Sequence, residues 1–271
     1  MANLSKVLII GAEGLIGNEL DFGIKLSHKD IDVTNRDSIK KALEKHRPEA
    51  VLNLASVNLR KAQEDPFLAN QVNVIGAYNV ALETKQKNIP LIIISTGAVF
   101  NGGLDREFNE EDTPNPLNIY GQTKYLAEIV VKETNFEYLI VRAGWLFGFK
   151  SGKNFFNRIM ESLNGERIEA TYDQFGSFTY IKDFTDKLKE IIEKDYRGIF
   201  HIANSGRGNT LELIESLIES FKSKTNIDKV SYNKFNTDIK RSQSEVLVSN
   251  IVKLRDWKLA LKECINMHVK K

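Results

Sequence analysis

The chain has little cysteine and no long apolar segment. Its one cysteine among 271 residues, Cys264, cannot form an intramolecular disulfide or build a cysteine-based metal cluster. No apolar run approaches the roughly 18 residues of a transmembrane helix. The run that follows residues 1–6 is also too short for a signal peptide. We therefore expect a cytoplasmic protein with no membrane partner and no metal site.

An excess of charge of one sign is also lacking. Lysine and arginine total 38 and aspartate and glutamate total 36, which leaves a net charge of +2. A nearly balanced surface gives no electrostatic reason to expect nucleic acid or an anionic membrane as a partner. The apolar share of 42% is ordinary for a globular protein and excludes a disordered or collagen-like chain.

Short apolar runs alternate with longer amphipathic segments. Runs rich in Ile, Val and Leu occur at residues 7–10, 24–26, 51–54, 91–94, 139–141 and 199–202. Apolar residues at helical spacing lie between them, at 37–46, 67–85 and 118–133. This alternation predicts an α/β fold with a doubly wound, Rossmann-type parallel sheet. In such folds ligands bind at the carboxyl ends of the strands.

The alternation weakens after about residue 148. Residues 154–163, 183–193 and 210–221 still have helical spacing, whereas residues 223–241 are polar and give no assignable pattern. We predict a dinucleotide-binding core of residues 1–147 plus 180–205. A smaller, discontinuous C-terminal lobe of residues 148–179 plus 206–271 would bind the substrate.

A glycine motif directly follows the first predicted strand. Gly11, Gly14 and Gly17 form G-x-x-G-x-x-G. Gly11 would allow a tight turn, Gly14 the approach of a pyrophosphate, and Gly17 close packing of the next helix. Leu15 and Ile16 would add the N–H groups of the helix start. The alternative is a glycine-rich turn that binds no ligand.

The second predicted strand is followed by Ser27, His28 and Lys29. A hydroxyl and a base at this position favour the 2′-phosphate of NADP, whereas an acid would favour NAD. Asp30 and Asp32 lie near the usual position of that acid, so NAD stays open, and Lys29 could be an ordinary surface lysine. Asp32 and Val33 could contact the adenine, or Asp32 could cap the helix that follows.

Candidate catalytic residues occur at two places. Thr96 ends a predicted strand, where its hydroxyl would face the ligand crevice, although a Ser-Thr pair can also simply form a turn. Tyr120 and Lys124 lie one helical turn apart. An ammonium about 4 Å from the phenol is worth about 4 kcal/mol at an effective dielectric constant of 20. That predicts a Tyr120 pKa near 7, suited to proton transfer, with Lys124 also holding the nicotinamide ribose. The alternative is a half-buried aromatic beside a snorkelling lysine.

Taken together, these motifs resemble the extended short-chain dehydrogenase/reductases. The segments 30–35, 47–55, 70–73, 95–102, 110–124, 142–148, 152–155, 173–176 and 198–202 resemble the dTDP-4-dehydrorhamnose reductase branch. The resemblance implies NADP(H)-dependent reduction of a 4-keto-6-deoxy sugar nucleotide in dTDP-rhamnose and polysaccharide biosynthesis. It implies Thr96, Tyr120 and Lys124 as the catalytic residues, with Tyr120 as proton donor. It places Leu54, Ala55 and Ser95 against the cofactor and Trp145 and Asn154 against the nucleotide sugar. It also allows a homodimer.

The chain departs from this branch at two places. Thr96-Gly97-Ala98 stands where the branch usually has Thr-Asp-Tyr, and Glu245 stands where it has a serine. Two alternatives therefore stay open: a sugar-nucleotide 4-epimerase with tightly bound NAD, and a non-catalytic, NADP-binding regulatory subunit. Several basic residues could face the substrate diphosphate or be solvated surface charges, namely Lys150, Lys153, Arg158, Arg207 and Arg241.

Overall fold

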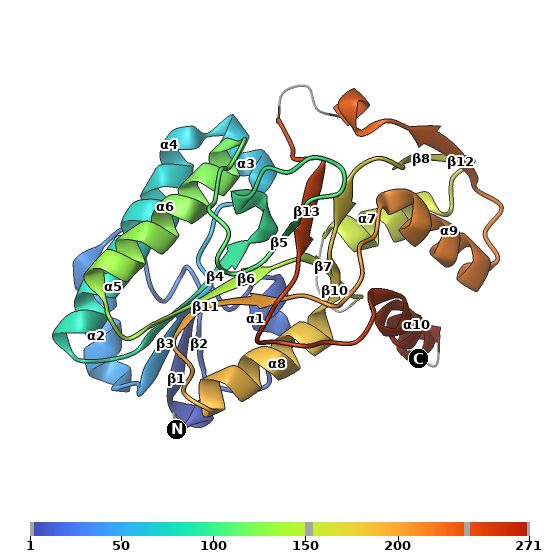
Figure 1. The fold of residues 1–271 in the computed structure, drawn as a ribbon. Coiled ribbons are helices and arrows are strands. Elements are labelled where there is room, and N and C mark those ends of the chain that lie inside the picture. Colours follow the sequence, from blue (N-terminus) through green and yellow to red (C-terminus); the bar gives the residue numbers. More distant parts are fainter. Residues whose placement is uncertain (1–2, 150–153, 236–238, 270–271) are drawn as a thin grey trace.

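A six-stranded parallel sheet forms the centre of the molecule (Figure 1). The computed structural model describes residues 3–149, 154–235 and 239–269. The sheet has the order β11-β6-β4-β3-β1-β2. Its strands are β1 (Val7–Ile10), β2 (Ile24–Leu26), β3 (Ala50–Asn53), β4 (Leu91–Thr96), β6 (Tyr138–Ala143) and β11 (Gly198–Ile202). The predicted doubly wound parallel sheet is confirmed.

The apolar runs form strands because both faces of the sheet are covered. All four residues of β1 are buried, as are all four of β3. β1 pairs with β2 on one side and with β3 on the other, so the order of strands along the sheet reverses between β1 and β3. The β1–β3 register runs from Val7↔Ala50 to Ile10↔Asn53. This switch point is where a doubly wound sheet opens a crevice at its carboxyl edge.

Helices pack on both faces of the sheet (Figure 1). α2 (Arg36–His46), α5 (Ala77–Gln86) and α6 (Ile119–Thr134) cover one face, whereas α1 (Leu15–Glu19) and α8 (Ile181–Glu193) contact each other on the opposite face. The single helix predicted for residues 67–85 is divided into α4 (Pro66–Ala69), a π-helical segment (Asn70–Gly76) and α5. Apolar spacing could not reveal this wider turn, because it preserves the helical character of the segment.

The C-terminal part is built from short elements. These are β7 (Trp145–Phe147) paired with β10 (Phe178–Tyr180), β8 (Arg167–Thr171) paired with β12 (Asn226–Val230), α7 (Phe155–Ser162), α9 (Thr210–Phe221) and α10 (Trp257–Val269). Residues 223–241, which have no assignable pattern of secondary structure in the sequence, contain β12 and a 3-10 turn (Tyr232–Phe235). Cys264 is buried within α10.

One small sheet joins segments that are far apart in the sequence. β13 (Ser244–Leu247) pairs with β5 (Glu107–Phe108) on one side and with β9 (Phe175–Gly176) on the other. β13 also passes the 3-10 turn Gly97–Val99 that follows β4. The C-terminal segment is therefore brought to the carboxyl edge of the central sheet. The remaining elements are a 3-10 turn (Leu4–Lys6) and α3 (Leu59–Glu64).

The hydrophobic core does not divide at the predicted lobe boundaries. Ile9 of β1 belongs to the same buried cluster as Phe156 of α7, Leu213 of α9 and Trp257 of α10. The division into residues 1–147 plus 180–205 and 148–179 plus 206–271 stays a prediction.

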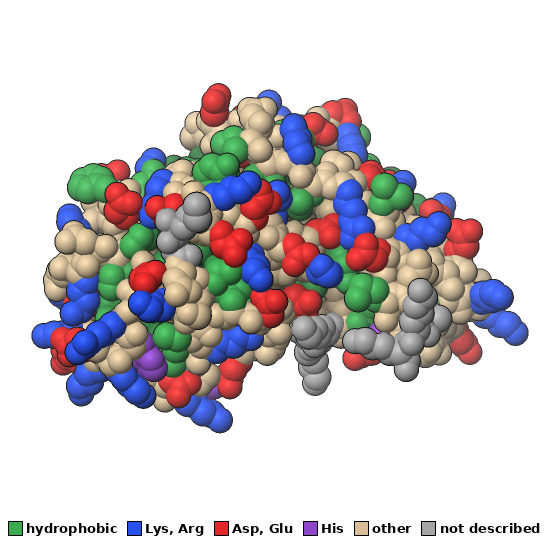
Figure 2. Space-filling view, turned by 90° about the horizontal axis from the view of Figure 1, so that it is seen from below, with side chains coloured by type: hydrophobic (Ala, Val, Ile, Leu, Met, Phe, Trp, Pro, Cys, Tyr) green, Lys and Arg blue, Asp and Glu red, His purple; other side chains and the backbone are tan. Residues whose placement is uncertain are grey.

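The surface carries interspersed charges of both signs. On the face shown in Figure 2, Lys and Arg side chains alternate with Asp and Glu side chains. Within the described residues, no helix is both long enough and apolar enough to cross a membrane.

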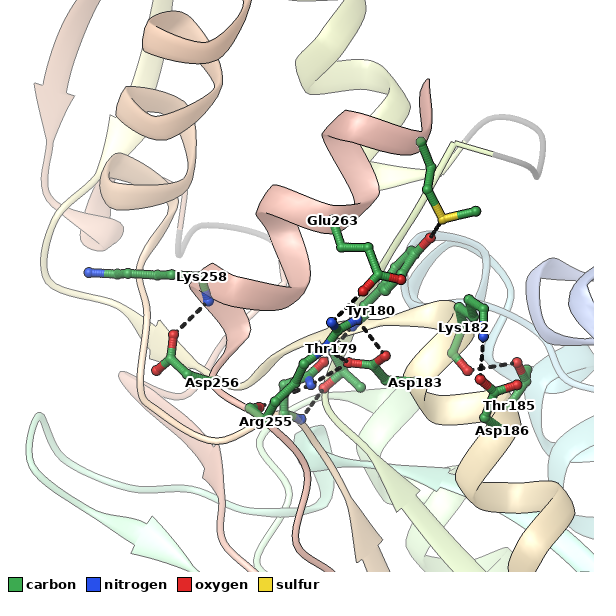
Figure 3. Close-up of polar contacts among 12 residues, drawn as sticks. Thr179, Tyr180, Lys182, Asp183, Thr185, Asp186, Arg255, Asp256, Lys258 and Glu263 are labelled. Carbon is green, nitrogen blue, oxygen red and sulfur yellow. Dashed lines mark hydrogen bonds and ion pairs between the residues drawn. The ribbon is translucent and has the colours of Figure 1, made fainter. Parts of the chain in front are cut away.

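A partly buried ion-pair network ties α10 to α8 (Figure 3). Arg255 donates through Nε and Nη2 to the two carboxylate oxygens of Asp183, at 2.8 Å each, and also pairs with Glu263. Asn204 donates to the same Asp183 carboxylate at 2.8 Å. Because the guanidinium binds the carboxylate in a bidentate manner, this contact fixes direction as well as distance.

We expect Arg255→Ala to lower the free energy of unfolding by about 1–3 kcal/mol, because it leaves a mostly buried carboxylate without its cation. Lys182→Ala is the matched control, since Lys182 forms an exposed ion pair with Asp186 on the same helix and should cost less than about 0.5 kcal/mol. Chemical denaturation measures both. Equal effects of the two substitutions would show that the Arg255 network does not hold α10.

Candidate functional site

The predicted site residues converge at the carboxyl edge of the sheet. Gly11 follows β1, Leu54 and Ala55 follow β3, Thr96 ends β4, and Tyr120 lies in the first turn of α6. The loops after β1 and β3 touch: a Cβ at Gly11 would lie 2.8 Å from the Ala55 nitrogen. Leu54 N also donates to Ile10 O at 2.9 Å. The sequence motifs from these separate segments therefore form one site.

The three motif glycines have different structural needs. Gly11 has a φ of +77°, and a Cβ at Gly17 would lie 2.4 Å from Ala12 O, so the fold itself requires both glycines. A Cβ at Gly14 would meet only Gly11 O, at an ordinary 3.5 Å. Gly14 precedes Leu15 and Ile16, the start of α1, whose first N–H groups lack acceptors within the helix. Packing therefore does not explain glycine at position 14.

The loop after β2 contains an acid as well as a base. Asp30 accepts hydrogen bonds from both the N–H and the hydroxyl of Ser27, at 2.8 and 2.7 Å. These bonds, the backbone bond first, lower the pKa of Asp30. Lys29 is exposed, and His28 contacts Glu13 at 3.1 Å. Ser27 is thus engaged by a carboxylate, and His28, Lys29 and Asp30 are all exposed.

Asp32 and Val33 stabilise the loop that leads into α2. Asp32 accepts from the N–H and the hydroxyl of Thr34, both at 2.8 Å. Val33 is 5% exposed and packs against Gly76. The N-cap of α2 is Asn35, so the alternative role of Asp32 as that cap is wrong.

Thr96 and Tyr120 form the polar centre of the site. They line the same cleft, and Thr96 Oγ1 accepts from Ala98 N at 3.2 Å. Burial raises the pKa of Tyr120 to about 12; the hydroxyl of Thr96 opposes this rise and the charge of Glu245 adds to it. The predicted value near 7 is wrong, because desolvation outweighs attraction and the charge that acts on the phenol is Glu245 rather than Lys124.

Lys124 is buried beside an ion pair. It is 7% exposed, and burial lowers its pKa to about 8 against the opposing effect of Glu128. Glu128 is itself bound by Arg142 through two hydrogen bonds, of 3.1 and 2.7 Å, and both side chains are 2% exposed. Because Arg142 already neutralises Glu128, Lys124 Nζ has no hydrogen bond or ion pair within the described ranges.

His201 completes this buried network. Its Nε2 lies 3.3 Å from Arg142 Nη1 and its Nδ1 lies 3.0 Å from Val248 O. Burial and the charge of Arg142 lower the pKa of His201. The neutral ring, with the proton on Nδ1, satisfies both contacts, so His201 positions Arg142 without adding charge.

A cleft of about 280 Å³ opens beside Thr96 and Tyr120. Its other lining residues are Leu59, Ala98, Asn118, Trp145, Leu146, Phe155, Arg158, Gln174, Thr210, Arg241 and Glu245. The predicted substrate residue Trp145 is therefore on the cleft wall. Asn154 is not among the lining residues: it caps α7 by accepting from Asn157 N at 2.8 Å.

The basic residues named from the sequence have different places. Arg158 and Arg241 line the cleft. Arg207 instead stacks on Phe175, with its guanidinium carbon 3.8 Å from the ring centroid, and pairs with Asp105. Arg207 therefore makes contacts within the fold and does not line the cleft. Lys150 and Lys153 lie outside the described residues.

Asn73 and Glu245 were not among the predicted site residues. Asn73, in the π-helical segment, accepts from Val57 N at 2.7 Å and donates to Thr123 Oγ1 at 2.9 Å, which ties the loop after β3 to α6. The signal that could have identified Asn73 is a polar residue at a position within an apolar helical pattern. Glu245 approaches the site only through the pairing of β13, which no local pattern reveals.

The chain is similar to known proteins over most of its length. The family model described as RmlD substrate binding domain matches residues 5–269. The chain is 28% identical to spore coat polysaccharide biosynthesis protein SpsK of Bacillus subtilis, over 96% of each chain. It is 27% identical to a dTDP-4-dehydrorhamnose reductase of Mycolicibacterium smegmatis, over 96% of this chain and 85% of the other. The structure resembles dTDP-4-dehydrorhamnose reductase of Bacillus anthracis in complex with NADP, with a TM-score of 0.91, 28% identity and coverage of 98% and 100%.

We expect Lys124→Met to stabilise the fold at neutral pH by roughly 1–3 kcal/mol, because it removes a buried ammonium. Since the pKa falls from 10.5 to about 8 on folding, the unfolded chain binds the additional proton between these values. The stability of the unsubstituted protein should therefore rise with pH across that window and reduce the difference. Thermal unfolding at pH 7 and pH 10 measures this. A constant or growing difference would contradict the burial of the charged group.

Proposed function

The chain belongs to the RmlD substrate-binding domain family, and from this premise we propose that it reduces the keto group of a 4-keto-6-deoxy sugar nucleotide with NADPH. The observation that carries the proposal is that Thr96 and Tyr120 line the same cleft, with the buried Lys124 one helical turn further along α6. The names of the relatives, dTDP-4-dehydrorhamnose reductase among them, support dTDP as the nucleotide.

Several features of the carboxyl edge fit a dinucleotide. Gly14 leaves space over the start of α1, where a pyrophosphate would approach the N–H groups. Ser95 Oγ is buried and has no hydrogen-bond partner within the described residues. Together with Lys124, it offers polar groups to a ribose. The cofactor would supply a hydride to the carbonyl carbon when bound.

We assign Tyr120 the role of proton donor. A phenol with a pKa of about 12 is fully protonated at neutral pH, so it holds the proton that the reduced carbonyl oxygen needs. Thr96 would hydrogen-bond the same oxygen and orient the carbonyl. Lys124, one helical turn further along α6, would hold the cofactor ribose.

NADP is the proposed cofactor because His28 and Lys29 are exposed after β2 and because the Bacillus anthracis reductase was crystallised with NADP. Lys29 would meet the 2′-phosphate. Asp30 remains compatible with that assignment, since its carboxylate is already engaged by Ser27. We propose that four further residues contact the cofactor. Leu54 and Ala55 lie in the loop after β3, and Asp32 and Val33 lie in the loop after β2.

On the substrate side, the cleft combines an aromatic wall with two cations. Trp145 would pack against the sugar, and Arg158 and Arg241 would face the diphosphate. An enzyme accounts for the complete Thr96, Tyr120 and Lys124 set better than a regulatory subunit does, because cofactor binding alone needs no proton donor at the cleft. The homodimer stays a prediction.

We expect Tyr120→Phe to lower kcat by at least about 100-fold, the size of a lost general acid, while NADPH binding is retained. Oxidation of NADPH in the presence of a dTDP-4-keto-6-deoxy sugar measures turnover, and fluorescence titration measures cofactor affinity. Tyr78→Phe is the control, because Tyr78 is an exposed tyrosine on α5. Turnover of the Tyr120 variant within a few-fold of the unsubstituted enzyme would refute the assignment.

We expect Gly14→Val to abolish NADPH binding and leave the fold intact, because the side chain would occupy the space proposed for the pyrophosphate and would meet only Gly11 O. Gly103→Val is the matched control, since a Cβ at Gly103 meets nothing within 4 Å. Cofactor titration and thermal unfolding separate the two effects. Unchanged NADPH affinity in the Gly14 variant would place the cofactor elsewhere.

A further inference from the structure

β13 brings a carboxyl group to the cleft at the point where β4 ends. The backbone of Glu245 passes so close to Gly97 that a Cβ there would lie 3.1 Å from Glu245 O and 3.5 Å from Glu245 Cβ. A side chain at position 97 would therefore require the Glu245 backbone to shift by a few tenths of an ångström. The departures at positions 97 and 245 that the sequence shows are thus adjacent in space.

The Glu245 side chain is held at one end. Its Oε2 accepts a hydrogen bond from Trp145 Nε1 at 3.0 Å. The indole is itself fixed, because it lies against Gly176, where a Cβ would be 2.5 Å from the ring, and Phe178 packs edge-on at 5.3 Å. The position of the carboxyl group is thus set by a rigid aromatic neighbour.

The other carboxyl oxygen is available. Glu245 is 8% exposed, and the described residues provide Oε1 with no hydrogen-bond partner. Glu245 nevertheless lines the cleft together with Thr96 and Tyr120. The carboxyl oxygen that Trp145 does not bind can therefore meet a polar group on a ligand in this cleft.

Three other titratable or charged side chains share the cleft wall with the Glu245 carboxyl group. Tyr120 lies on α6, Arg158 on α7, and Arg241 on the segment before β13; these are the titratable or charged side chains that line the cleft with Glu245. Burial raises the pKa of Glu245, and the Trp145 hydrogen bond and Arg241 oppose the rise. The carboxyl group can accept a hydrogen bond in either form and can also donate one when protonated, so both forms suit a hydroxyl group.

We propose that Glu245 binds the C3 hydroxyl of the sugar and selects substrates that carry it. This inference rests on the proposed function. In a 4-keto-6-deoxy sugar, the carbonyl carbon C4 has two ring neighbours: C5 carries the methyl group and C3 carries a hydroxyl group. With the carbonyl oxygen at Thr96 and Tyr120, C3 is the neighbour that offers an oxygen to the adjacent carboxyl group.

The test compares two substrates with one enzyme at a time. We expect the unsubstituted protein to prefer a dTDP-4-keto-6-deoxy sugar over its 3-deoxy analogue by roughly 10–100-fold in kcat/KM. Glu245→Ala should reduce this preference to within about threefold and leave NADPH affinity unchanged. Glu245→Gln, which can still donate and accept, should retain most of the preference. Glu161→Gln, an exposed glutamate on α7, is the control.

A loss of activity toward both sugars in equal proportion would overturn the proposal, because it would assign Glu245 a structural role only. Glu245→Met, which preserves volume, replaces the alanine variant if that variant does not fold. If the unsubstituted protein reduces neither sugar, the proposed function fails separately. Calorimetric titration with the two corresponding 4-hydroxy sugar nucleotides then tests Glu245: equal affinities for both in the unsubstituted protein would overturn the proposal.

Discussion

Desolvation at the carboxyl edge of the sheet is the constraint on which the site depends. Lys124 and Glu245 are buried and Tyr120 is partly buried, and this burial shifts the pKa of each group in the direction that favours its neutral form. Tyr120 therefore keeps its proton at neutral pH, and Lys124 becomes easier to deprotonate. The buried side chains of Glu128 and Arg142 are instead paired with each other at 2.7 Å. The fold thus tunes Tyr120 and Lys124 before any ligand arrives.

Much of the fold and part of the site could be predicted from the sequence. The strands of the central sheet are continuous apolar runs, and the glycine motif and the Tyr120–Lys124 spacing are local patterns. The short strands β5, β9 and β13 could not be predicted, because two to four residues carry no usable period and their pairing joins positions that are far apart in the sequence, such as Ser244 with Phe175 and Val246 with Glu107.

The sign of the Tyr120 pKa shift could not be predicted for a related reason. The i, i+4 spacing of Tyr120 and Lys124 indicates proximity but gives no information on burial or on a third charge. In the structure, desolvation dominates and Glu245, 125 positions further along the chain, supplies the acting charge. Gly97 and Ala98 replace two polar residues that the family usually has. Glu245 lies against Gly97 and lines the cleft together with Ala98, so a carboxyl group is present there.

The central claim is that hydride reaches the carbonyl carbon while Tyr120 protonates the oxygen. Transfer of deuterium from 4-deuterated NADPH to a dTDP-4-keto-6-deoxy sugar tests it most directly. The account predicts that NMR of the product finds one deuterium on C4 for each NADPH oxidised. A sugar that is interconverted without net oxidation of NADPH, or a product that carries no deuterium at C4, would contradict it.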